Sequence, residues 1–239
     1  MQLTYFGHSA FILESLGVKL LFDPFLSGNP VAESAGITPQ TLLKQHTNLT
    51  VICLTHAHAD HVGDSVFLSE SAQIPVVANY ELAGWLGAQQ TNAQTQPLAH
   101  FGINMGGVVK FGDIAVKIVP AAHTSSLPNG VYGGVAAGFV VRSPNFCVYI
   151  SGDTGLMADM RLIGEVEKPN IAILCVGGHF TMGYEDAAIA CHLLGVEKAV
   201  GVHFDTFGPI AIDHAAAQAH LAKVGKTLIL PKVGQVIAL

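Results

Sequence analysis

Charged residues are scarce in this sequence. Of its 239 residues, 12% are Asp, Glu, Lys or Arg, and the formal net charge is −6. The 11 Lys and Arg residues are scattered singly, so no basic stripe is available to follow a nucleic-acid backbone. This pattern disfavours nucleic acid as a partner and favours a small-molecule substrate. Half of the residues are apolar, and such a lightly charged surface favours a homo-oligomer.

Cysteine is also scarce. The sequence has four, at Cys53, Cys147, Cys175 and Cys191, each in an apolar run and none in a C-x-x-C pair. We interpret them as buried free thiols of a reducing compartment, with disulfides as the alternative. The chain shows no charged leader with a cleavable apolar segment and no apolar run of membrane-spanning length. We therefore expect a cytoplasmic protein with no membrane partner.

Short-period repeats, low-complexity tracts and linkers are missing, which favours one domain over residues 1–239. Both halves begin with a predicted β meander and continue in alternating strands and helices, including a helix near 80–90. A polar loop is expected at 27–39, and a terminal strand pair ends the chain. The pattern predicts an α/β fold in which two sheets pack as one sandwich with helices outside.

Four strong metal-ligand side chains crowd into six positions of the stretch 55–63: His56, His58, Asp60 and His61. The apolar run before them predicts a buried strand, so the cluster lies on a loop at a strand end. Side chains two apart in extended backbone point the same way, which lets His56 and His58 bind one ion. Asp60 and His61, around the turn, then face a second ion. The alternative is a polar turn in which Asp60 caps the next helix.

Three further ligand types follow predicted strands: His123, Asp153 and His203. Each has an ordinary structural interpretation, because a His can simply end a strand and an Asp between glycines often shapes a turn. The carboxyl ends of strands converge on the ligand crevice of an α/β sheet, so these side chains are expected to meet the first cluster. Five His and two Asp suit two ions with one shared carboxylate.

The order His-x-His-x-Asp-His, a later His, Gly-Asp-Thr and a last His resembles the metallo-β-lactamase superfamily. That family's fold is a four-layer αβ/βα sandwich with two mixed sheets, outer helices and a binuclear metal site at one edge. The segments 5–11, 23–26 and 177–183 further resemble the branch of uncharacterised metal-dependent hydrolases related to ascorbate-6-phosphate lactonase. The resemblance spans nearly the whole chain and is far more specific for fold than for substrate.

The resemblance also implies a role for each ligand. The first ion is held by His56, His58 and His123; the second is held by Asp60, His61 and His203; Asp153 bridges the two. Relatives with a redox di-iron centre carry Glu where this sequence has His58, which argues against oxygen reduction. Imidazole and carboxylate ligands suit two divalent ions, zinc first, with manganese or iron as alternatives. A hydroxide between the ions would attack an ester, lactone, amide or phosphodiester bond, with Asp60 and Asp153 as catalytic carboxylates.

Supporting residues are sought at neighbouring strand ends. Asp23 is expected to accept a ligand His N–H, together with Thr55, although Asp before Pro is equally a turn residue. His179 lies on a glycine-containing loop, where we expect a substrate-contacting or proton-donating role, with Thr181 beside it as a supporting or substrate-contacting residue. The position of His8 is equally compatible with a substrate-contacting role and with that of a hydrogen-bonded loop histidine.

Three functions remain open from the sequence. The favoured one is metal-dependent hydrolysis of an ester or lactone-type bond in a small metabolite, phosphorylated or not. The second is a phosphodiesterase or nuclease of the same superfamily, which the acidic charge disfavours. The third is a non-catalytic metal-binding or assembly protein, which the complete ligand set disfavours.

Overall fold

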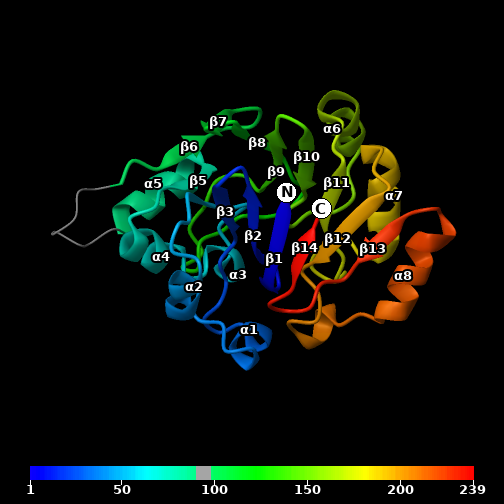
Figure 1. Ribbon diagram of the computed structural model, residues 1–239, viewed down its shortest axis with the longest axis horizontal. Helices are drawn as coiled ribbons and strands as arrows, with labels where there is room; N and C mark the ends of the chain where they lie inside the picture. Colours follow the sequence, from blue (N-terminus) through cyan, green and yellow to red (C-terminus); the bar gives the residue numbers. More distant parts are fainter. Residues whose placement is uncertain (90–97) are drawn as a thin grey trace.

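Two mixed seven-stranded sheets pack face to face in the computed structural model, which describes residues 1–89 and 98–239. Figure 1 shows helices α2, α4 and α5 on one side and α6, α7 and α8 on the other. The α/β sandwich predicted from the sequence is therefore confirmed. The first and last strands pair in one sheet, which places the two chain ends side by side (Figure 1).

Each sheet begins with antiparallel strands and continues with parallel ones. The first sheet runs in the order β14-β1-β2-β3-β4-β5-β6 and is parallel from β3 onward. Its strands are β1 (Gln2–Gly7), β2 (Ala10–Ser15), β3 (Val18–Phe22), β4 (Val51–Cys53), β5 (Val76–Asn79), β6 (Phe101–Ile103) and β14 (Val236–Ala238).

The second sheet repeats this plan in the order β13-β12-β11-β10-β9-β8-β7, with antiparallel neighbours from β7 to β10 and parallel neighbours from β10 to β13. Its strands are β7 (Val108–Phe111), β8 (Ile114–Pro120), β9 (Ala137–Ser143), β10 (Phe146–Ile150), β11 (Ile171–Cys175), β12 (Lys198–Val202) and β13 (Thr227–Ile229). The helices are α1 (Pro30–Ser34), α2 (Pro39–Gln45), α3 (Ala59–Val62), α4 (Ser65–Ala72), α5 (Tyr80–Gln89), α6 (Asp159–Glu167), α7 (Tyr184–Leu194), α8 (His214–Lys223) and the 3₁₀ helix η1 (Gly208–Ile210).

Alternating side chains along the first sheet explain why it is covered on both faces. Phe11 and Leu13 of β2 belong to the core between the sheets, whereas Ile12 packs into the core under helices α4 and α5. Phe11 stacks on its cross-strand partner Phe22 at 4.8 Å between ring centroids, and Phe22 meets Phe139 of the second sheet edge-on at 5.7 Å. These rings join the two sheets directly.

Two details of the sequence prediction change, and a third extends beyond the described residues. The expected loop 27–39 contains helix α1, which Asn29 caps by accepting bonds from two backbone N–H groups while Pro30 fills its first position. The expected terminal strand pair is wrong, because β13 joins β12 in the second sheet whereas β14 joins β1 in the first. The predicted helix 80–90 is α5, and residue 90 lies outside the described residues.

The cysteines and the lengths of the helices bear on two further expectations from the sequence. All four cysteines are buried free thiols. In the described part of the chain, no helix is long and apolar enough to cross a membrane.

Candidate metal centre

The stretch 55–63 leaves the end of β4 as predicted and then folds into the short helix α3. His56 and His58 precede the helix, His58 in extended backbone, and Asp60 and His61 lie within it. Gly63 ends the helix with a φ of 42°, where an added Cβ would lie 2.4 Å from the carbonyl oxygen of Pro24. Only glycine fits this close approach, so the loop after β3 is held against the helix.

The other three candidate ligands follow strands of the second sheet. His123 comes after β8, Asp153 after β10 and His203 after β12. Asp153 and His203 are each 2% exposed, while His123 is half-buried. The backbone N–H of His203 donates to the carbonyl oxygen of His8 at 2.8 Å, which ties the two sheets together beneath the site.

All seven residues converge, and their ligand atoms form overlapping groups that each lie within 4.8 Å. The groups are His56, His58 and His123; His56, His61 and Asp153; and Asp60, His61 and His203 together with His8. Asp153 lies near both outer groups, since its Oδ2 is 3.3 Å from His61 Nε2, 3.0 Å from His203 Nε2 and 3.7 Å from His123 Nε2. Asp153 thus stands beside histidines of both outer groups.

The donor atoms fit divalent cations. His61 Nε2 and Asp153 Oδ1 are buried and have no hydrogen-bond partner among the described residues. Burial lowers the pKa of His56, His58 and His123, which keeps these imidazoles neutral and their lone pairs available. A buried carboxylate and neutral imidazoles without thiolate are ligands that zinc, manganese and iron accept.

His61 and Asp153 carry the charge of the ion-free site. Burial alone would lower the pKa of His61, but the carboxylates of Asp153 and Asp23 outweigh it and raise that pKa well above its usual range. Burial opposes ionisation of Asp153, yet His61 and His203 hold its pKa well below the usual range. Protonated His61 therefore supplies part of the positive charge that a cation would replace.

A carboxylate behind the ligands fixes the orientation of two rings. His61 Nδ1–H donates to Asp23 Oδ2 at 2.8 Å, and Thr55 Oγ1–H donates to the same oxygen at 2.7 Å. His56 Nδ1–H in turn donates to Thr55 Oγ1 at 3.0 Å. Each ring thus turns its Nε2 toward the centre.

His8 is fully buried and joins Asp60 to a residue that the sequence did not suggest. Its Nε2 lies 3.1 Å from Asp60 Oδ2 and its Nδ1 lies 2.9 Å from Thr206 Oγ1. Burial lowers the pKa of His8 to about 4, so the ring is neutral at pH 7 and donates from Nε2 to Asp60. No sequence signal marked Thr206, because it is one threonine in a loop and its partner lies 198 positions away.

His179 and Thr181 are not among the converging groups. They lie on the loop after β11, where His179 is exposed with a φ of 55° and Thr181 is half-buried. Between them, Phe180 lines a cavity of about 480 Å³ that opens over the site. The remaining lining residues are His58, Asp60, His123, Thr124, Asp153, His203, Phe207 and Pro209.

A comparison with known proteins identifies this arrangement. The family model described as "Beta-lactamase superfamily domain" matches residues 19–204, which include all seven converging residues. The chain belongs to this beta-lactamase superfamily.

Relatives within the superfamily carry hydrolase names. A UPF0173 metal-dependent hydrolase of Methylacidiphilum infernorum is 42% identical over 96% of this chain and 100% of its own length. The structure of a metallo hydrolase from the archaeon Ignicoccus hospitalis is 32% identical, with a TM-score of 0.85, covering 99% of this chain and 97% of that one. An isothiocyanate hydrolase from Delia radicum gut bacteria, 20% identical over 100% and 99% of the two chains, has a TM-score of 0.73 and shows the same fold.

Proposed function

We propose that this beta-lactamase superfamily chain, as one domain over residues 1–239, is a binuclear metal-dependent hydrolase that cleaves an ester or lactone-type bond of a small molecule. The observation that supports this most is the position of Asp153, whose Oδ2 lies 3.0 Å from His203 Nε2, 3.3 Å from His61 Nε2 and 3.7 Å from His123 Nε2. Zinc is the first candidate for both ions, with manganese or iron as alternatives. The hydrolase names of the full-length relatives support the same reaction class.

The first ligand set would be His56, His58 and His123, and the second Asp60, His61 and His203, with Asp153 between them. Bound divalent ions would lower the pKa of a water to about 7 and polarise the substrate's carbonyl oxygen. The chain's own contribution is positional. Asp23 and Thr55 hold the rings of His61 and His56, and His8 holds the carboxylate of Asp60.

Asp60 is placed to do more than bind an ion. It is 32% exposed, lines the cavity and accepts a hydrogen bond from neutral His8. Although burial opposes ionisation, the hydrogen bond from His8 and the charge of His61 lower the pKa of Asp60, which keeps it a carboxylate at neutral pH. An anionic acceptor in the cavity would orient a water for attack.

His179 is proposed as the proton donor for the leaving group from the rim of the cavity. Its ring meets that of Phe180 edge-on at 4.4 Å between centroids, and Phe180 lines the cavity. The variant His179→Gln is expected to lower kcat while metal content stays at the wild-type value. An unchanged kcat would remove His179 from the reaction.

The test of the hydrolase proposal combines metal analysis with a screen of lactones, thioesters, carboxylic esters and phosphodiesters. We expect about two divalent ions per chain and turnover of an ester or lactone. Asp153→Ala should lose both, whereas Asp159→Ala, which removes an exposed carboxylate at the start of α6, should change neither. Full metal occupancy without any turnover, and with Asp153→Ala identical to wild type, would overturn the proposal. Turnover of phosphodiesters alone would establish the alternative activity instead.

A further inference from the structure

The cavity over the site has two unlike walls. One wall consists of ligand-type side chains together with Thr124, and the other consists of Phe180, Phe207 and Pro209. Phe180 is 52% exposed and Phe207 is 37% exposed, both large values for aromatic side chains beside a buried polar cluster. Apolar side chains together with a few convergent polar groups are the usual lining of a small-molecule pocket.

Cations are missing around this cavity. No Lys or Arg lines it in the described part of the chain. No Lys or Arg occurs in the loops that carry the lining residues, at 54–64, 121–136, 151–158, 176–183 and 203–213. A phosphate on the substrate, away from the ions, would therefore have no charged partner, although Arg and Lys are the residues that usually bind one.

Hydrogen bonds fix the backbone that carries Phe180. The backbone N–H of Gly178 donates to the carbonyl oxygen of Met182 at 3.2 Å, which closes the loop on itself. The N–H of Met182 donates to the carbonyl oxygen of Thr154 at 2.8 Å, next to Asp153. Phe180 is thus held beside the polar wall by the same segment that carries the shared carboxylate.

The position of Phe207 is fixed by aromatic packing. Its ring lies 5.7 Å from the buried ring of His8 and 6.3 Å from Phe25, measured between centroids. His8 is also hydrogen-bonded to Asp60. One buried residue therefore contacts both walls and fixes the position of Phe207 relative to Asp60. An aromatic surface that is already in place binds an apolar group at little entropic cost.

From these two walls we infer that the site takes an uncharged substrate whose aromatic or branched aliphatic group lies against Phe180 and Phe207. A phosphate on that group is selected against, contrary to the phosphorylated metabolite that the sequence left open. The inference rests on the proposed hydrolase function and adds the substrate class to it.

A matched pair of esters tests the inference on the metal-loaded protein. Phenyl acetate is uncharged, and 4-acetoxyphenyl phosphate carries a phosphate on the far side of the same ring. In both, water adds OH to the acetyl carbon and a proton to the phenol oxygen as the ester C–O bond breaks. We expect kcat/KM for phenyl acetate to be at least about tenfold higher, because the phosphate must lose water without gaining a charged partner. The ratio kcat/KM is the right quantity, because phosphate bound unproductively to the ions does not change it.

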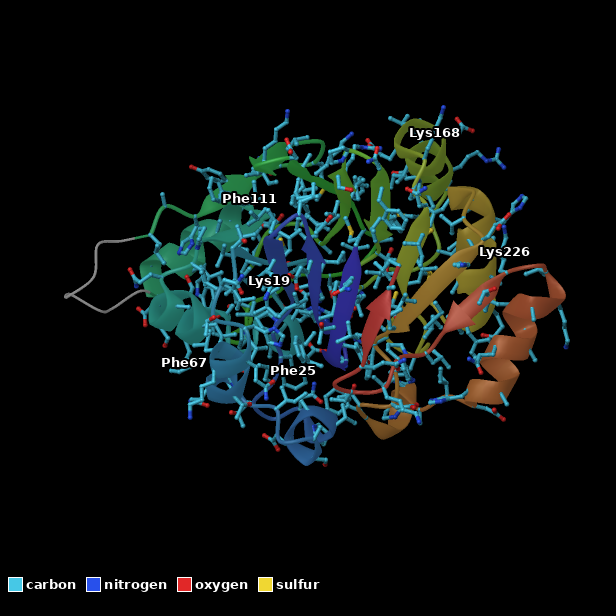
Figure 2. All side chains as sticks on the ribbon, viewed as in Figure 1. Lys19, Phe25, Phe67, Phe111, Lys168 and Lys226 are labelled. Atoms are coloured by element: carbon cyan, nitrogen blue, oxygen red, sulfur yellow. The ribbon has the colours of Figure 1, made fainter. Side chains whose placement is uncertain are left out.

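Alanine variants of Phe180 and Phe207 test whether the apolar wall binds the substrate. Phe180→Ala and Phe207→Ala should each lower kcat/KM for phenyl acetate by about tenfold, the usual effect of removing part of an apolar pocket. Phe67→Ala is the matched control, because Phe67 is 42% exposed but lies on helix α4 outside the cavity (Figure 2). Binding of acetophenone, a neutral analogue that cannot be hydrolysed, is measured in parallel by NMR line broadening. Metal content is measured for every variant and should stay at the wild-type value.

The outcomes separate this inference from the hydrolase proposal. Preference for the phosphorylated ester, or Phe180→Ala and Phe207→Ala behaving like Phe67→Ala, would overturn the inference and leave the hydrolase intact. If neither ester is hydrolysed but both cavity variants lose acetophenone binding, the inference holds while the proposed reaction fails. Absence of both hydrolysis and binding would overturn both.

Discussion

Asp23 and His61 are joined by a 2.8 Å hydrogen bond from Nδ1–H to Oδ2 across 38 positions of sequence. Both side chains are buried, and the left-handed backbone of Asp23, with a φ of 37°, turns the chain at the end of β3. The carboxylate also accepts bonds from the backbone N–H and hydroxyl of Thr55. One residue thus orients a candidate ligand and the start of the ligand loop.

Asp23→Asn tests this orienting role. The variant keeps the shape of the side chain but loses the anionic acceptor for His61 Nδ1–H, so metal affinity should fall by about 10- to 100-fold. Competition with a chromophoric chelator measures the affinity. Asp64→Asn is the control, because Asp64 is also a carboxylate that accepts two backbone N–H bonds, yet it holds only the 26–27 segment. Equal metal affinity in wild type and Asp23→Asn would mean that the carboxylate serves the turn alone.

Gly133→Ala tests how the ligand loop is supported from outside. An added Cβ at Gly133 would lie 2.1 Å from the Cβ of Ala57, which stands between His56 and His58. One of the two segments must move, and overpacking of this kind costs about 1–3 kcal/mol in free energy of unfolding. Urea denaturation measures that cost, and metal affinity is expected to fall with it. Gly208→Ala, where nothing lies within 4 Å of an added Cβ, should leave both nearly unchanged.

A pH prediction concerns Glu167, which is remote from the candidate ligands in the fold. Its carboxylate lies 2.6 Å from Lys117 Nζ and 3.1 Å from Arg142 Nη2. Burial raises the pKa of Glu167, but the two cations outweigh it and the net shift is downward. The folded-state pKa is therefore below the unfolded value of about 4.3, so the pairs stabilise the fold above that pH. This stability is lost as the pH falls through the folded-state pKa.

Glu167→Gln should accordingly be less stable than wild type at pH 7, by up to about 1 kcal/mol for partly exposed pairs. The difference should shrink when the pH is lowered from 7 to an acid value below the unfolded-state pKa of about 4.3, because Glu167 of the wild type becomes protonated as the pH falls through its folded-state pKa. Urea denaturation at both pH values measures it. Glu165→Gln, an exposed position on the same helix, serves as control. A difference that grows toward acid pH would contradict the assigned direction of the shift.

The sequence predicted best where the information is local. His56, His58, Asp60 and His61 stand within six positions after an apolar strand, so their type and spacing alone predict a metal loop. His123, by contrast, is ambiguous in isolation, because a histidine after a strand is common. It gained meaning only from the topology that brings strand ends to one edge.

What the sequence could not show depends on contacts between distant segments. Thr206 meets His8 across 198 positions, and no pattern in either segment indicates the pair. Phe180 and Phe207 stand in loops, where an aromatic residue is equally compatible with core packing or a cavity wall. The pairing of β14 with β1 likewise joins the two ends of the chain, and nothing in residues 236–238 distinguishes this partner from β13. Local periodicity carries no information about such choices.

His58→Ala tests the first ligand set directly. His58 Nδ1 lies 2.9 Å from His56 Nε2, and its Nε2 lies 3.3 Å from Thr124 Oγ1 at the cavity wall. Without it, one set retains only His56 and His123, so metal content should fall from about two ions to about one per chain. The fold should persist, because His58 is half-buried and a core of this size does not depend on the ions.

Metal content of His58→Ala is measured after dialysis, and circular dichroism and urea denaturation report on the fold. His192→Ala is the matched control, since His192 is an exposed histidine on helix α7. It should keep the wild-type metal content. Two ions per chain in His58→Ala would remove His58 from the ligand set. Loss of the folded signal would instead show that the fold depends on the bound ions. The complete burial of His56 and His61 argues against such a dependence.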